Sequence, residues 1–156
     1  MQIVFIKTSH AEYTLRCTRE DGSVTEITLN ARSYLKHDIV HFVLEKEAGL
    51  TESFFGIVAG GRELDALTPA AMKGEPEMSR EIQTTEMIVG ALQGALQKSV
   101  VESDFTAHMV EYLKLHNITP PLYLTQEFIQ NVFDKILTIL AKYRDIKTGQ
   151  QLDFSF

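Results

Sequence analysis

Two histidines and two carboxylates stand close together in one short stretch of the chain, residues 37–45 with the sequence HDIVHFVLE. In a helix, at about 100° per residue, they fall within one arc of about 100°. They are His37, Asp38, His41 and Glu45. Most other residues of the stretch are aliphatic or aromatic, so we expect a helix that is buried around most of its surface. Its polar stripe would consist of imidazole and carboxylate groups.

This stripe predicts a site for a divalent metal ion, with zinc as the first candidate. His37 and His41 are one turn apart, so their rings can converge on one ion. Asp38 and Glu45 are the candidate catalytic carboxylates, because a carboxylate beside a metal site can hold a water or accept its proton. Glu45 lies about 12 Å along the helix axis from His37. We therefore expect Glu45 to support His41 rather than to share the ion with both histidines.

A third ligand must come from another part of the chain. Glu52 is the first candidate, because the chain can fold back over the helix end through Gly49. Glu86 is the second, since it belongs to a later predicted helix that could hold it in place. His108, which borders the apolar stripe of its own predicted helix, is the third.

The motif resembles the HExxH helix of zinc hydrolases, in which two histidines bind zinc and the glutamate acts as general base. Asp38 stands where that family has glutamate, and its side chain is one methylene shorter. An HDxxH helix followed by a glutamate also resembles the zinc motif of the coenzyme Q biosynthesis accessory family. Glu52 follows His41 by one residue fewer than that pattern has, and no function is carried over from it.

Two other interpretations stand beside the metal site. Asp38 suits the first turn of any helix, where its charge meets the positive end of the helix dipole. The stripe could then be a solvated face or a set of hydrogen-bonded packing residues.

Gly90 and Gly94, four residues apart in a predicted helix, indicate either close packing within the chain or a homodimer contact. The second functional hypothesis is therefore an interaction module without chemistry.

Composition narrows the class of protein. The 156 residues carry 15 basic and 21 acidic side chains, a net charge of −6. Such a chain has no basic surplus with which to bind nucleic acid. We expect no membrane span, since no apolar run approaches the roughly 18 residues that one needs. Cys17 is the single cysteine, and the start of the chain lacks the features of a signal peptide, so we expect a cytoplasmic protein. The sequence does not identify a small-molecule ligand.

The first thirty residues predict an antiparallel β-meander. Its strands are expected at residues 2–8, 12–19 and 24–29. In the second strand Tyr13, Leu15 and Cys17 alternate with polar residues, which places them on one face. Asp21-Gly22 predicts a two-residue hairpin turn, because both residues tolerate positive φ angles.

The remainder of the chain predicts mostly helices. A helix is expected to begin near residue 33 and to end near Gly49. The apolar run 54–59 is expected to be a buried strand. Residues 67–79 are expected to be a mobile loop. Later helices are expected at 79–99, 104–116 and 125–143. From Leu152, at the C-terminal end, the alternation favours a strand that returns to the sheet, with a docked irregular tail as the alternative. The sequence thus predicts a single α+β domain spanning residues 1–156.

Overall fold

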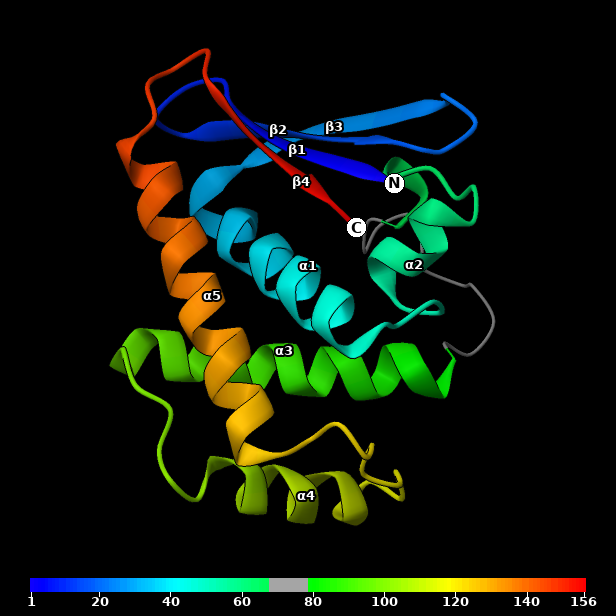
Figure 1. The fold of residues 1–156 in the computed structure, drawn as a ribbon, viewed down its shortest axis with the longest axis vertical. Helices are drawn as coiled ribbons and strands as arrows, with labels where there is room; N and C mark the ends of the chain where they lie inside the picture. Colours follow the sequence, from blue (N-terminus) through cyan, green and yellow to red (C-terminus); the bar gives the residue numbers. More distant parts are fainter. Residues whose placement is uncertain (68–78) are drawn as a thin grey trace.

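The computed structural model describes residues 1–67 and 79–156 and shows an α+β fold, as predicted. A sheet forms one side of the molecule, and helices are stacked beneath it (Figure 1). The predicted loop at 67–79 falls almost entirely outside the described residues. No helix of the described part combines the length and the apolar character that crossing a bilayer would demand.

Four antiparallel strands form the sheet within the described residues, in the order β3-β2-β1-β4. Their bounds are β1 Gln2–Lys7, β2 Glu12–Thr18, β3 Val24–Asn30 and β4 Gln151–Ser155. The predicted meander and the predicted C-terminal strand are therefore confirmed. In the register, Phe5 of β1 lies opposite Leu15 on one side and Leu152 on the other. The two ends of the chain thus meet in neighbouring strands.

The turn between β2 and β3 differs from the predicted two-residue hairpin. The backbone N–H of Arg19 donates to Ser23 over 2.9 Å, so three residues lie between the closing pair. Gly22 has a φ of 84°, whereas Asp21 keeps a negative φ and accepts a hydrogen bond from the Ser23 N–H. A three-residue loop of this kind needs a left-handed residue only at its last position, which glycine supplies.

The core lies between the sheet and α1 (Lys36–Ala48), which crosses directly beneath the strands (Figure 1). Tyr13, Leu15 and Cys17 are completely buried on the helix-facing side, as their alternation predicts. The ring of Phe42 from α1 contacts Phe5, with centroids 6.3 Å apart. Burial of these large side chains ties the helix to the sheet.

The predicted helix near residues 33–49 is present and ends at Gly49, whose φ is 66°. A short π-helical segment, Ala31–Leu35, precedes it, and the side chain of Asn30 caps that segment by accepting hydrogen bonds from Arg32 and Ser33. The later helices match their predicted positions within two residues: α3 is Arg80–Lys98, α4 is Phe105–Leu115 and α5 is Gln126–Asp145.

The predicted buried strand at 54–59 is wrong, because these residues form the helix α2 (Phe54–Ala59). Phe55 and Val58, three residues apart, are fully buried, which is a helical spacing. Gly56 packs against the backbone of Thr51 so closely that a Cβ would lie 2.5 Å from its carbonyl carbon. The apolar run by itself does not distinguish a buried strand from a buried helix, so the sequence pattern left the choice open.

Candidate metal site

The polar stripe of α1 points into the protein rather than into solvent. Asp38, His41 and Glu45 are all buried, and His37 at the beginning of the helix is partly exposed. A helix whose polar residues are buried must satisfy them with partners from other elements. The solvated-face interpretation is therefore wrong for these three residues.

Glu45 holds His41 in place. Its Oε1 lies 2.8 Å from Nδ1 of His41, and its Oε2 accepts the backbone N–H of Phe55 over 2.7 Å. The Glu45 side chain is 0% exposed, and each of its oxygens has a partner. The supporting position that the sequence predicts for Glu45, next to His41, is what the geometry shows.

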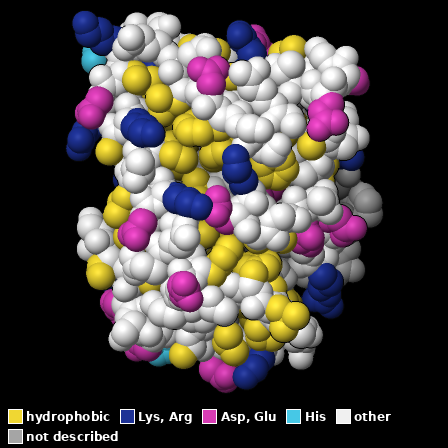
Figure 2. Space-filling model, in the orientation of Figure 1, with side chains coloured by type: hydrophobic (Ala, Val, Ile, Leu, Met, Phe, Trp, Pro, Cys, Tyr) yellow, Lys and Arg dark blue, Asp and Glu magenta, His cyan; other side chains and the backbone are white. Residues whose placement is uncertain are grey.

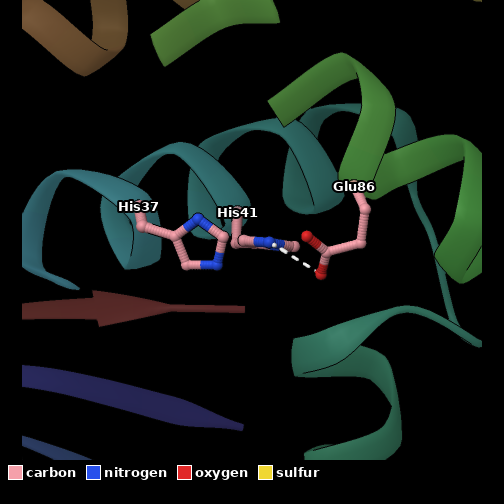
Figure 3. A group of neighbouring side chains, drawn as sticks. All are labelled: His37, His41 and Glu86. Carbon is pink, nitrogen blue, oxygen red and sulfur yellow. Dashed lines mark ion pairs between the residues drawn. The ribbon is translucent and has the colours of Figure 1, made fainter. Parts of the chain in front are cut away.

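The other ring nitrogen of His41, Nε2, points toward α3. It lies 3.3 Å from Oε1 of Glu86, without the geometry of a hydrogen bond. Within the described residues this buried nitrogen has no hydrogen-bond partner. Figure 3 shows the Glu86 carboxylate reaching toward the His41 ring from the neighbouring helix. The nitrogen thus has an ion-pair contact with Glu86 but no hydrogen bond, and a metal ion held by both groups would give this buried nitrogen a partner.

His37 completes the cluster from the preceding turn of α1. Its ring centroid lies 4.5 Å from that of His41. One potential ligand atom from each of His37, His41 and Glu86 lies within 4.8 Å of the others. Ligand atoms around a tetrahedral zinc ion are roughly 3.3 Å apart, at metal distances of about 2.0–2.1 Å. Small side-chain rotations would therefore bring these atoms to coordinating distance.

The electrostatics of the cluster follow from burial and from its carboxylates. Burial opposes the charged form of His41, but the hydrogen bond to Glu45 and the contact with Glu86 outweigh it and raise its pKa to about 9. Burial and the neighbouring His41 lower the pKa of His37, although Glu86 and a hydrogen bond to Gln93 act in the opposite direction. Burial also opposes the charge of Glu86, yet His41 holds its pKa below the ordinary value.

Asp38 faces the sheet. Its Oδ2 accepts a short hydrogen bond from the hydroxyl of Tyr13 on β2. Burial raises the pKa of Asp38 to about 6, against the opposing effect of Tyr13. Burial and the adjacent Asp38 also raise the pKa of Tyr13 above its ordinary value. Asp38 therefore links α1 to the sheet and is not part of the three-residue cluster.

The predicted third ligands are placed very differently. Glu52, the first candidate, is exposed, and its backbone N–H donates to Oε1 of Glu81 over 2.6 Å. It does not belong to the cluster. His108 is exposed on α4, where its ring lies 3.6 Å from Asp104. Glu86, the second candidate, is the residue that the structure brings to the histidines.

Sequence reasoning missed two partners of the site. Tyr13 binds Asp38 from the sheet, and Gln93 binds His37 from α3. Gln93 follows Glu86 by seven residues, a spacing that places both on one face of a helix. This spacing was the one sequence signal for Gln93 as a partner of the site. It shows that Gln93 and Glu86 share a face of α3, but not which helix packs against that face.

Comparisons with protein families, with curated proteins and with solved structures yield no match to this chain.

Proposed function

We propose that the protein binds a divalent metal ion, of the zinc type, through His37, His41 and Glu86, and that it acts as a metal-dependent hydrolase. One observation carries the proposal: the buried Nε2 of His41 has no hydrogen-bond partner among the described residues and lies 3.3 Å from Glu86, in a cluster that His37 completes. Two imidazoles and one carboxylate form a donor set that suits zinc.

The number of ligands favours catalysis over a structural role. Structural zinc sites have four protein ligands, whereas catalytic sites have three and leave one position open. In the described part of the chain the cluster has three members. When bound in such a site, a divalent ion polarises a substrate carbonyl and makes water more acidic.

The contacts favour positioning roles for Asp38 and Glu45 over the catalytic roles that the sequence suggests. Both oxygens of Glu45 are occupied by His41 and Phe55, so this carboxylate orients the His41 ring and selects the tautomer whose Nε2 is free. Asp38 is held by Tyr13 and anchors the beginning of α1 to the sheet. A cytoplasmic location stays part of the proposal, with the single Cys17 buried and free.

Metal titration of the purified protein tests the proposal. We expect one zinc ion per chain, with affinity lowered in His37→Ala, His41→Ala and Glu86→Gln. His108→Ala is the matched control, because it removes an exposed histidine outside the cluster. Zinc should raise the free energy of unfolding of the wild type, by about 2.7 kcal/mol at a free concentration one hundred times the Kd. A wild type that binds no metal, or a control as impaired as Glu86→Gln, contradicts the proposal.

A second candidate function is a homodimeric interaction module. Gly90 and Gly94 are exposed, and within the described residues no atom lies within 4 Å of a Cβ built on either, so close packing inside the chain does not explain them. A mostly apolar groove of about 580 Å³ lies between the end of α3 and α4. Val100 and Tyr112 on its walls are 49% and 47% exposed. Figure 2 shows apolar side chains at the surface in the lower part of the molecule, where α4 lies.

Sedimentation of the wild type and of Gly94→Arg tests this candidate. A dimer that dissociates in the variant would support it. A wild type that is monomeric at high concentration would exclude a homodimer through α3. The two candidate functions also make different demands on the surface around Gly90. A second copy of the chain bound to this face of α3 would cover the side of the metal cluster that borders Gly90.

A further inference from the structure

The face of α3 that borders the metal cluster contains a glycine between two polar residues. Glu86, Gly90 and Gln93 follow at intervals of four and three residues, so they share one side of the helix. Glu86 contacts His41, and Gln93 contacts His37. Gly90 therefore lies on the same side of α3, in the turn between the residues that contact the two histidines.

Packing does not require glycine at this position. Gly90 is exposed, its φ is not in the left-handed region, and among the described residues nothing lies within 4 Å of a Cβ built on it. Alanine would fit and would favour the helix more strongly. A glycine that is not needed for backbone conformation or packing is typical of a place where a ligand approaches the backbone.

A larger side chain at this position would cover Glu86. Side chains on a helix point toward its N-terminus, so a residue covers the turn that precedes it. The turn before Gly90 contains Glu86, whose side chain is 42% exposed. His41 is buried, whereas His37 and Glu86 are both partly exposed, so solvent reaches the cluster beside these two residues.

We infer that Gly90 forms the entrance to the open coordination position of the metal site and that this entrance admits a small anionic donor such as a carboxylate. This inference rests on the proposed metal site and specifies how its substrate reaches it. A divalent ion with two neutral imidazole ligands and one carboxylate ligand keeps a charge of +1 in its first coordination shell and one open position, which an anionic ligand can fill. The absence of a side chain at Gly90 leaves room for that anion beside Glu86.

Cobalt(II) titration separates the metal site from its entrance, because the visible spectrum of bound cobalt reports its ligands. Azide serves as the small anionic probe and acetate as the carboxylate. In the wild type we expect cobalt to bind and both anions to change its spectrum. In Gly90→Leu we expect cobalt to bind as before, with the apparent affinity for both anions lowered by about tenfold or more. Gly90→Gln provides a second, polar blocking variant.

Two controls isolate the position. Gly94→Leu adds the same side chain one turn later, at another exposed position of α3, and Gly90→Ala adds only a methyl group; both should keep the anion affinity of the wild type. Failure of the wild type to bind cobalt overturns both the proposed function and this inference. If cobalt binds and the anions change its spectrum equally in the wild type, Gly90→Leu and Gly90→Gln, the inference about Gly90 is overturned while the proposed metal site stands. Loss of cobalt binding in both blocking variants also overturns it, because Gly90 would then be needed for the metal rather than for access.

Discussion

Nδ1 of His41 lies 2.8 Å from Oε1 of Glu45, one turn later on the same helix, and both side chains are buried. The second oxygen of Glu45 accepts the backbone N–H of Phe55, which is at the beginning of α2. One carboxylate thus orients a candidate metal ligand and caps the neighbouring helix.

Substitution Glu45→Gln should impair both functions of this carboxylate. The amide has one acceptor oxygen for two donors, so either one donor loses its partner or the His41 ring must accept from the amide at Nδ1 and carry its proton on Nε2, the nitrogen that zinc needs. We expect a free energy of unfolding lower by about 2–3 kcal/mol, measured by urea denaturation of the metal-free protein. Zinc affinity should fall by about 10- to 100-fold. Glu52→Gln, at an exposed position outside the cluster, is the control. Equal effects of the two substitutions would argue against a positioning role for Glu45.

The stability of the metal-free protein should depend on the titration of Asp38. Burial raises its pKa from 3.8 to about 6 in the folded state. Between these values the folded state binds more protons than the unfolded state, so the free energy of unfolding falls as pH rises. Asp38→Asn does not titrate, and should therefore gain on the order of 2–3 kcal/mol relative to wild type between about pH 4 and pH 7. Urea denaturation at several pH values, with a chelator present, measures this difference; a constant difference would contradict the prediction.

Gly56→Ala should destabilise the fold by at least about 2–3 kcal/mol. The added Cβ would lie 2.5 Å from the carbonyl carbon and oxygen of Thr51, and backbone atoms cannot rotate away. Gly90→Ala is the matched control, because its Cβ meets no atom of the described residues and it should stabilise α3 by about 1 kcal/mol. Both values come from denaturant unfolding. If both substitutions changed the free energy of unfolding in the same direction, the close approach of Gly56 to Thr51 would not be a feature of the folded protein.

Cys17 should be unreactive in the folded protein. Burial raises the pKa of its thiol to about 12, although the nearby Arg19 acts in the opposite direction. The thiolate that reacts with disulfide reagents is then scarce at neutral pH, and the sulfur is also inaccessible. We expect reaction with an aromatic disulfide reagent only at the rate of unfolding, with rapid reaction in denaturant. Rapid reaction under native conditions would show that the sheet opens locally at β2.

Local periodicity was sufficient to predict most elements of this fold. Alternation placed Tyr13, Leu15 and Cys17 on one buried face, and apolar spacing located α1, α3, α4 and α5, because strands and amphipathic helices leave distinct repeats. The run that forms α2 has no such repeat. Its apolar residues suit either structure, and the contact of Gly56 with Thr51 is made only once the chain is folded.

The sequence by itself determined that His37 and His41 lie one above the other on a single helix, because four residues make about one turn. It also determined that Glu45 lies near His41 and that the N-terminal strands form a meander. The tertiary structure decided that Glu86, rather than Glu52, faces the histidines, and that Tyr13 holds Asp38. These pairings join residues far apart in the chain, and they depend on how α1 packs against α3 and the sheet. That packing is set by the whole core, not by any local repeat.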